Sequence, residues 1–600
     1  MPNSTNDILA DAGHRSSETE FYTPLPDGYE RGKTRYVVVM GTVMSGLGKG
    51  IFSSSLAKLL KDKGLRVAPI KMEGYLNLDS GTLNPYRHGE VFVLDDGMET
   101  DMDLGTYERM LDQNLTGDNF VTSGQVYRRV LDKERHGGYL GRDVQMIPHV
   151  TGEVKYMLRQ LAVKQQADVV FVEVGGTVGD FENGFYIEAL RELAFEEGER
   201  SVCFVALTYV IEPQALGEQK SKAAQLGVKR MMELGVQPHM IACRATNEVN
   251  DTVREKIAMF TNVPMRRVFS MHDRDSIYTI PEDMHRQALD IEILSLLDMH
   301  SRVRPAAEDK ARHQWGRFVE QLTNPHRHQI KIGITGKYAT LRDAYASIDK
   351  AIEHCSAHLN ADIDVQWIDT GELDASTEAI AELLAPLNGI IVPGGFGARG
   401  TEAKIACVRY ARENRTPYLG ICLGFQMAVV EYARHVCGMT DAASSEFDTH
   451  AARAVIDILP EQKKIEGLGG NMRLGGKDVQ ITANTRAVML FGNARAVRRR
   501  FRHRYEVDPQ YIDELTAHGL IFSGRHPDQP IMQILELPHD QHPYFLGAQF
   551  HPELTSRPLD PSPLFMGLTA AAIQHANPDL PPEKISPRYL PDPNHHTVDA

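Results

Sequence analysis

The stretch "RYVVVMGTVMSGLGKGIFSSSLAKLLKDKG" (35–64) decides the fold class of this chain. Its first six residues are an apolar run that favours a strand buried on both faces, as in a parallel sheet. A glycine-rich turn follows, and the apolar residues then recur at helical spacing. Backbone N–H groups at the start of such a helix, together with Lys49, are suited to hold phosphate. The stretch therefore predicts an α/β unit with a phosphate-binding turn.

The same alternation of strand and helix recurs along the chain and divides it into two α/β domains. In the N-terminal half we expect strands at 35–40, 66–72, 168–174, 201–207 and 239–244. In the C-terminal half we expect them at 330–335, 363–369, 389–395, 417–424 and 544–550. The expected boundaries are a disordered extension (1–31), a first domain (32–300), a polar connector with one short helix (301–328), a second domain (329–575) and an unstructured proline-rich tail (576–600).

Composition excludes several classes of protein. A chain of 600 residues is too long for one core, which agrees with two domains. A net charge of −15 argues against a surface that binds nucleic acid. Six cysteines without a CxxC pair indicate a reduced, cytoplasmic chain rather than a disulfide or zinc framework. No apolar run approaches the roughly 20 residues needed to cross a bilayer, and the polar N-terminus does not resemble a signal peptide.

The second half carries a candidate nucleophile in "GICLGFQ" (420–426). A strand that ends in G-x-C-x-G turns sharply into a helix, exposes Cys422, and places it at a helix N-terminus that favours the thiolate. A base and an orienting acid are present in "QFHPE", where His551 and Glu553 alternate at strand spacing and should point the same way. "PGGFGARG" (393–400) offers an oxyanion hole, built from backbone N–H groups of Gly394, Gly395 and Gly397.

Each of these motifs also has a purely structural interpretation, as a core cysteine, a turn or a loop. Their presence together in one domain, with compatible roles, favours catalysis. The combination resembles the class I glutamine amidotransferase domain over most of 330–570. The resemblance implies a flavodoxin-like fold and a Cys–His–Glu triad that releases ammonia from glutamine through a glutamyl thioester. It also implies a set of glutamine-binding residues: Gly395, Phe396, Gln426, Glu446 and Arg504.

The phosphate turn of the first half departs from the Walker A pattern, because Gly50 replaces the Ser or Thr that touches Mg²⁺. Acidic side chains must then supply the hard oxygen ligands that Mg²⁺ prefers. Glu173 is a strong candidate, since an acid inside an apolar strand is costly unless it has a partner. Asp103 is the second, although it could be one more solvated acid of the loop "DDGMETDMD". The sequence thus predicts a metal site at Asp103 and Glu173.

The first half resembles the synthetase domain of the CTP synthase family, a P-loop-like amidoligase. The resemblance rests on "SGLGKG", "HGEVFVLDDGMETDMDLGTYER", "NFVTSGQVY", "VQMIPH", "VEVGGTVGDFE", "GEQKSK" and "DSIYTIP". With the glutaminase half it covers nearly all of 30–570. It implies a ligase that forms a C–N bond: ATP phosphorylates O4 of UTP, and ammonia, passed through an interior channel, displaces the phosphate to give CTP.

The resemblance carries over to numbered residues and to regulators. The ATP-binding residues it implies are Ser45, Gly46, Leu47, Gly48, Lys49, Gly50, Lys71, Arg244 and Asp273. The UTP- and CTP-binding residues it implies are Ser45, Gln145, His149, Asp180, Glu182, Lys220, Lys222, Gln225 and Lys256. It further implies Mg²⁺ as cofactor, CTP as feedback inhibitor, GTP as allosteric activator with Lys337 and Arg399 as weaker candidates for its contacts, homotetramers, and possible filaments.

Three departures from the family pattern leave alternatives open. Glu73 and Gly74 stand where the family has Asp and Pro, "KSKAAQ" (220–225) lacks a proline and a threonine of the family motif, and Thr42 replaces a glycine. None of these changes removes a lysine, the thiol or a metal-binding acid. The alternatives are an amidoligase of the same family that acts on another 4-oxo pyrimidine nucleotide, and a non-catalytic, filament-forming paralogue.

Overall fold

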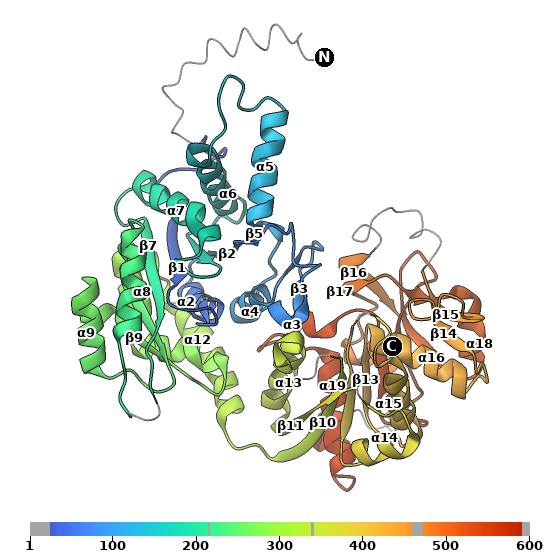
Figure 1. Cartoon of the computed structure of the whole chain (residues 1–600). Coiled ribbons are helices and arrows are strands. Elements are labelled where there is room, and N and C mark those ends of the chain that lie inside the picture. The colour runs from blue at the N-terminus through green and yellow to red at the C-terminus, as the bar shows by residue number, and fades with distance from the viewer. Residues whose placement is uncertain are drawn as a thin grey trace. The chain divides into compact units, whose positions relative to one another are not determined.

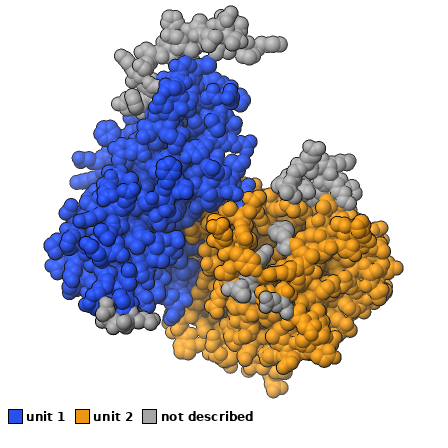
Figure 2. Space-filling model, viewed as in Figure 1, with its two compact units in different colours: residues 1–80, 106–313 blue, residues 81–105, 314–600 orange. Residues whose placement is uncertain are grey.

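The computed structural model describes residues 24–213, 217–337, 341–371, 373–395, 397–458 and 472–590. Most of the expected N-terminal extension and the last ten residues lie outside these ranges. The chain forms two compact units, shown in different colours in Figure 2. The first contains residues 1–80 and 106–313, and the second contains residues 81–105 and 314–600. The segment 81–105 therefore clusters with the unit that the C-terminal part of the chain builds.

The first unit is built on a parallel sheet of seven strands in the order β5-β2-β6-β1-β7-β8-β9 (Figure 1). The expected strands of this half are all present. The strands are β1 (Arg35–Gly41), β2 (Val67–Glu73), β5 (Phe120–Thr122), β6 (Val169–Val174), β7 (Val202–Tyr209), β8 (Met240–Ala245) and β9 (Val268–His272). β1 is buried along almost its whole length, which is the reason its sequence is continuously apolar.

Helices connect successive strands of this sheet, as the parallel pairing requires. They are α2 (Lys49–Asp62), α4 (Met102–Leu111), which crosses the boundary between the two units, α5 (Ser123–Arg135), α6 (Thr151–Lys164), α7 (Gly184–Glu197), α8 (Lys222–Glu233) and α9 (Asp251–Thr261). Two further helices, α10 (Ile280–Arg286) and α11 (Leu289–Leu296), follow the last strand, β9. Short turns of 3-10 or π helix are η2 (Gly117–Asn119), η3 (Met146–Val150), η4 (Phe181–Asn183), η5 (Met265–Arg267), η6 (Ile277–Thr279) and η7 (His300–Arg302).

The turn between β1 and α2 has the backbone that its glycines predict. Gly48 caps α2 in the left-handed conformation (φ 76°), and Gly46 is also left-handed (φ 75°). No acid stands in the first turn of α2. The N-terminal N–H groups of this helix therefore stay suited to an anion.

The second unit is built on a mixed sheet of nine strands in the order β11-β10-β12-β13-β21-β20-β19-β16-β17. Its first five strands are parallel and coincide with the five that the sequence predicts: β10 (His328–Gly336), β11 (Ala361–Asp369), β12 (Gly389–Val392), β13 (Tyr418–Ile421) and β21 (Phe545–Ala548). The other four pair antiparallel: β16 (Arg473–Ile481), β17 (Ala496–His503), β19 (Ile521–Arg525) and β20 (Met532–Glu536).

Helices and two small sheets complete the second unit. Its helices are α3 (Pro85–His88), α12 (Pro305–Thr323), which begins in the first unit, α13 (Ala346–Leu359), α14 (Thr377–Leu384), α15 (Thr401–Glu413), α16 (Leu423–His435), α17 (Arg486–Leu490), α18 (Ile512–Ala517), α19 (Pro563–Ala576) and α20 (Pro582–Ile585). Its 3-10 turns are η8 (Arg342–Tyr345), η10 (Pro509–Tyr511) and η11 (Pro552–Thr555). The small sheets contain β3 (Val91–Val93) with β4 (Glu99–Asp101), and β14 (Ala442–Ser444), β15 (Arg453–Asp457) and β18 (Glu506–Val507).

Two expectations about connecting segments differ from the structure. The expected short helix of the connector is α12, which runs for 19 residues because Trp315 and Phe318 give it an apolar side to bury. The tail beyond residue 576 was expected to lack structure. Its described part instead forms α20, and Leu590 is buried in the core of the second unit. Prolines at the start of α20 are compatible with a helix, because the first turn needs no N–H donor.

Candidate active site

Cys422 stands at a sharp turn between β13 and α16. It is the N-cap of α16 and has φ 53° and ψ −101°, a backbone conformation that is strained for a residue with a side chain. The two flanking glycines make the turn possible. A Cβ on Gly420 would lie 2.4 Å from the hydroxyl of Tyr418, and one on Gly424 would lie 1.9 Å from the carbonyl oxygen of Val392. The G-x-C-x-G spacing is thus required by close approach on both sides of the cysteine.

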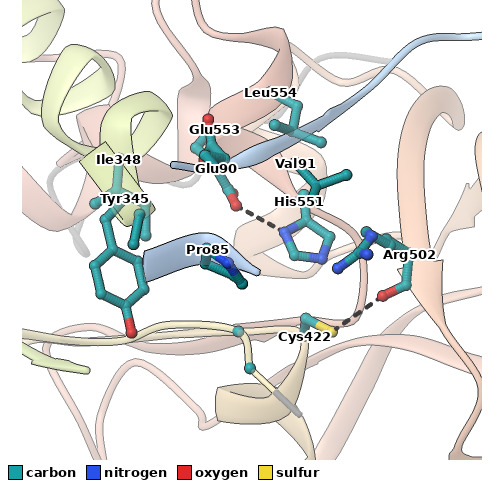
Figure 3. Close-up of a pocket in the computed structure, with 13 residues that line it drawn as sticks. Pro85, Glu90, Val91, Tyr345, Ile348, Cys422, Arg502, His551, Glu553 and Leu554 are labelled. Carbon is teal, nitrogen blue, oxygen red and sulfur yellow. Dashed lines mark hydrogen bonds and ion pairs between the residues drawn. The ribbon is translucent and has the colours of Figure 1, made fainter. Parts of the chain in front are cut away.

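His551 and Glu553 meet as the sequence predicts, although not on a strand. The imidazole Nδ1 of His551 lies 2.7 Å from Oε1 of Glu553 (Figure 3). The expected strand spacing is wrong here, because β21 ends at Ala548 and Glu553 lies in the turn η11, which Pro552 begins. Burial by itself would lower the pKa of His551, but the charges of Glu553 and Cys422 oppose it and raise that pKa to about 10. The imidazole is therefore held in its protonated form at neutral pH.

The thiol and the imidazole share one cavity of the second unit. A Cβ built on Gly394 would lie 3.1 Å from Cε1 of His551 and 3.5 Å from Cβ of Cys422, so the three residues surround one small volume. Figure 3 shows the imidazole facing the sulfur, which donates a hydrogen bond of 3.7 Å to the backbone carbonyl of Arg502. A protonated imidazole beside a thiol is the arrangement of an activated cysteine nucleophile.

The glycine loop after β12 offers backbone donors to this cavity. Within the described part of the chain, the N–H groups of Gly394 and Gly395 make no hydrogen bond. Gly397 differs, because its N–H donates to Oε1 of Glu446 at 2.9 Å. The expectation that all three glycines serve an oxyanion hole is therefore corrected: Gly397 positions an acid, and Gly394 and Gly395 remain as donors.

The expected glutamine-binding residues lie around the same loop. Glu446 is bonded to Gly397, and burial raises its pKa although that hydrogen bond and the charges of Lys337 and Arg504 oppose the rise. Gln426, in the first turn of α16, donates through Nε2 to the carbonyl of Tyr505 at 3.0 Å. Gly395 borders the thiol cavity, and Phe396 lies outside the described residues.

The cavity is also lined by a segment that the motifs did not point to. Pro85, Glu90 and Val91 belong to the segment 81–105 and border the cavity that contains Cys422 and His551 (Figure 3). Glu90 is fixed there, because its carboxylate accepts a hydrogen bond of 3.2 Å from the N–H of Ser347. No motif in the sequence predicts this placement, since the segment lies more than 300 residues from the cysteine.

In the first unit, lysines and acids gather at the phosphate turn. Nζ of Lys49 donates to the carbonyl of Gly176 at 2.7 Å. Nζ of Lys71 lies 2.6 Å from Oε1 of Glu173, a fully buried carboxylate that also accepts a bond of 3.0 Å from the hydroxyl of Tyr107. Glu73 approaches the same Lys71 ammonium at 3.4 Å. A buried carboxylate with only hard oxygen donors, beside two lysines, fits Mg²⁺ together with phosphate.

The remaining expected nucleotide contacts are distributed around this edge of the sheet. Arg244 and Asp273 form an ion pair of 2.6 Å at the ends of β8 and β9. His149 accepts a hydrogen bond of 3.0 Å from the N–H of Gln145, and the Asp180 carboxylate accepts one of 2.6 Å from the N–H of Thr177.

Three lysines and two further residues complete the set. Lys220 pairs with Glu218, the side chain of Gln225 is buried, and the exposed members of the set are Glu182, Lys222 and Lys256. Asp103 lies in the first turn of α4 and belongs to the second unit, whereas Glu173 belongs to the first.

Comparison with known proteins identifies the family of both halves of the chain. The family model "CTP synthase N-terminus" matches residues 35–299, and "Glutamine amidotransferase class-I" matches residues 340–571. A CTP synthase of Methanopyrus kandleri is 46% identical over 538 residues, which is 90% of this chain and 99% of that protein. One of Haloarcula hispanica is 47% identical over 539 residues, 90% of this chain and 95% of that protein. The chain belongs to the CTP synthase family.

A solved structure titled as the glutaminase domain of Trypanosoma brucei CTPS with bound acivicin is also similar, at 36% identity and a TM-score of 0.38. It covers 41% of this chain and 94% of that structure. The predicted two-domain α/β fold of a CTP synthase, a parallel-sheet amidoligase followed by a class I glutamine amidotransferase, is confirmed. No helix among the described residues is long and apolar enough to cross a membrane.

Two buried contacts at the candidate sites of this CTP synthase family member escaped the sequence-based prediction. The hydroxyl of Tyr107 in α4 donates a hydrogen bond to Glu173 of β6, which a lone tyrosine in a helix does not reveal. Lys404 is fully buried in α15 behind the glycine loop. The burial of Lys404 could have been predicted from the sequence, because Lys404, Val408 and Ala411 share the i, i+4, i+7 spacing of one buried helix face.

Proposed function

We propose that this protein is a glutamine-hydrolysing CTP synthase that aminates UTP at C4 and consumes ATP. The single observation that carries the proposal is the Cys422 elbow beside an imidazole that Glu553 holds protonated, in a chain that the family models match in both halves. A thiol site alone fits any glutaminase. The phosphate turn and its buried Glu173 supply the second chemistry that a synthase needs.

At the thiol site Cys422 and His551 react as an ion pair: the thiolate sulfur, whose proton His551 holds, attacks the side-chain amide carbon of glutamine. The carbonyl oxygen becomes an oxyanion, which the N–H groups of Gly394 and Gly395 stabilise. His551 donates its proton to the amide nitrogen, which leaves as ammonia while the C–N bond breaks and a thioester remains. Water then attacks the thioester, with His551 accepting its proton, and glutamate leaves. Glu446 and Arg504 are placed to hold the α-ammonium and α-carboxylate of glutamine, with Gly395, Phe396 and Gln426 beside them.

At the phosphate turn O4 of UTP attacks the γ-phosphorus of ATP, and ADP leaves. Ammonia then adds to C4, and phosphate departs with O4 to give CTP. Lys49 and Lys71 neutralise charge on the phosphates in transit. Mg²⁺ held by Glu173 and Asp103 would add positive charge on the same oxygens.

The other expected residues take part as binding groups. For ATP they are Ser45, Gly46, Leu47, Gly48, Gly50, Arg244 and Asp273, and for UTP or CTP they are Ser45, Gln145, His149, Asp180, Glu182, Lys220, Lys222, Gln225 and Lys256. We further propose CTP as feedback inhibitor, GTP as activator acting near Lys337 and Arg399, a homotetramer able to form filaments, and a cytoplasmic location.

The Cys422→Ala variant tests the two-site scheme. We expect glutamine-driven CTP formation to fall by at least about 1,000-fold, because no nucleophile remains. Ammonium chloride should still drive CTP formation within about twofold of the unaltered protein, because the phosphate turn is unchanged. The measurement is the absorbance change on conversion of UTP to CTP, with each nitrogen source in turn. Loss of both activities would contradict the scheme, as would preference for another 4-oxo nucleotide over UTP.

A further inference from the structure

Lys404 is a lysine buried where a positive charge is costly. Its side chain is fully buried in α15, and no carboxylate pairs with it among the described residues. Burial and, to a smaller extent, the nearby charge of Lys337 lower the pKa of Lys404 to about 7, against the opposing influence of Cys407 and Cys422. A methionine would fill the same space without this penalty. The lysine therefore needs an explanation other than packing.

Among the residues that the structure describes, the amine of Lys404 has one hydrogen-bond acceptor, and that acceptor belongs to the glycine loop after β12. Nζ donates to the backbone carbonyl of Pro393 at 2.9 Å, in a buried setting. This carbonyl shares a planar, trans peptide unit with the N–H of Gly394, so the two groups point in opposite directions. Fixing the Pro393 oxygen toward α15 therefore fixes the Gly394 N–H in the opposite direction, away from α15.

The Gly394 end of this peptide faces the reacting groups. A Cβ on Gly394 would contact the imidazole of His551 at 3.1 Å and Cβ of Cys422 at 3.5 Å. The next residue, Gly395, is also a glycine, and glycine restricts backbone rotation less than any other residue. A Pro-Gly-Gly loop without an anchor can rotate this peptide and turn a carbonyl oxygen toward the place of the oxyanion.

We propose that Lys404 is a positioning residue for glutamine hydrolysis, which anchors the Pro393 carbonyl so that the Gly394 N–H stays aimed at the oxyanion. The inference rests on the glutaminase chemistry proposed above. The lysine touches neither glutamine nor the thiol, and it acts through the peptide that it holds. Its role is therefore specific to steps in which an oxyanion forms.

The Lys404→Met variant separates this role from packing and from a direct effect on the thiol. Methionine matches the lysine stem but lacks the donor. We expect kcat for glutamine hydrolysis to fall about 10- to 100-fold, which is at most the fall that follows removal of one oxyanion donor. KM for glutamine should stay within about threefold of that of the unaltered protein. Inhibition by glutamate γ-semialdehyde, whose adduct with Cys422 carries the oxyanion, should weaken by a similar factor. Alkylation of Cys422 by iodoacetamide forms no oxyanion and should keep its rate within about threefold.

Two further variants serve as controls. Arg409 lies on the exposed side of the same helix, where it pairs with Glu413, so Arg409→Met should keep full glutaminase activity. Lys404→Gln keeps an N–H donor on a shorter stem and should retain more kcat than Lys404→Met. Ammonia-driven CTP formation by each variant checks that the chain is folded.

Three results would overturn the proposal. A kcat within threefold of the unaltered protein would show that the anchor is dispensable. A parallel fall of alkylation and kcat would show that Lys404 acts on the thiol itself, and a Gln variant no better than Met would exclude the hydrogen bond. Absence of glutaminase activity in the unaltered protein and in Arg409→Met would instead refute the proposed function, and the role of Lys404 that rests on it would be refuted too.

Discussion

At the scale of single residues, the contact between Glu553 and His551 predicts a pH dependence of stability. The pKa of His551 is about 10 in the folded protein against an ordinary value of 6.5. Because the pKa is raised in the folded protein, this ion pair contributes fully to the free energy of unfolding below about pH 6.5, and the contribution is lost as the pH rises toward 10. Glu553→Gln removes the neighbouring charge, so the pKa of His551 should fall and less stability should be lost between pH 7 and 10.

Urea denaturation at a series of pH values measures this effect. Both tryptophans, Trp315 and Trp367, lie in the second unit, so their fluorescence reports the unit that contains His551. We expect the free energy of unfolding to decline less steeply above pH 7 in Glu553→Gln than in the unaltered chain. Parallel declines in the two proteins would show that the carboxylate does not hold the imidazole protonated.

The residues that the sequence revealed are those whose motifs fix them relative to the backbone. Cys422 was found because the glycines on both sides have a steric purpose, and His551 and Glu553 because they stand two residues apart. The donor role expected of Gly397 was wrong, because only the fold brings Glu446 to its N–H. Tyr107 was missed for the same reason, since its partner Glu173 lies on another element.

At the scale of elements, the packing of α16 on β12 rests on Gly424. A Cβ at this position would lie 1.9 Å from the carbonyl oxygen of Val392, so Gly424→Ala must push the helix off the strand. We expect a loss of about 2–3 kcal/mol in the free energy of unfolding, as for other overpacked sites. Glutaminase activity should fall as well, because α16 carries Cys422 at its N-terminus.

Gly316→Ala is the matched control for this prediction. Gly316 lies in α12 of the same unit, and no atom lies within 4 Å of a Cβ built there. Alanine favours the helix, so this variant should gain up to about 1 kcal/mol. Tryptophan fluorescence during urea denaturation measures both variants. Equal stability of the two would show that α16 has room to shift.

A strand can be predicted from the sequence where its burial produces a continuous apolar run. β17 is a strand without such a run. Parallel strands buried on both faces, such as β1 and β6, read as apolar runs, and all ten expected strands are present. β17 reads "AVRRRFRH", with four arginines, and no apolar run marks it. Its Arg500 is nonetheless buried, because the guanidinium stacks on the ring of Phe92 and donates to the carbonyl of Val93. Val93 lies 407 residues away in the sequence and Phe92 precedes it, so a local sequence pattern cannot predict these partners.

At the scale of the whole molecule, the division into two units differs in one respect from the order of the sequence. The segment 81–105 belongs to the half that the amidoligase model matches, yet its contacts lie with the second unit. Ion pairs hold it there, from Asp95 to Arg498 at 2.9 Å and from Glu99 to Arg502 at 2.7 Å. Sequence patterns place strands within a half of the chain, but they do not tell which core a loop joins. The domain bounds drawn from the sequence therefore stay a prediction.

Removal of divalent metal tests whether glutamine hydrolysis and CTP formation depend on separate sets of residues, as proposed. Glu173 is proposed as a Mg²⁺ ligand, whereas Cys422, His551 and Glu553 need none for acyl transfer. Excess EDTA should therefore abolish CTP formation from either glutamine or ammonia, while basal hydrolysis of glutamine continues within about threefold. Added Mg²⁺ should restore synthesis in the unaltered chain, and Glu173→Gln should stay inactive in synthesis at any Mg²⁺ concentration while it still hydrolyses glutamine. A glutaminase that EDTA abolishes would mean that the thiol site depends on metal, against the mechanism proposed for it.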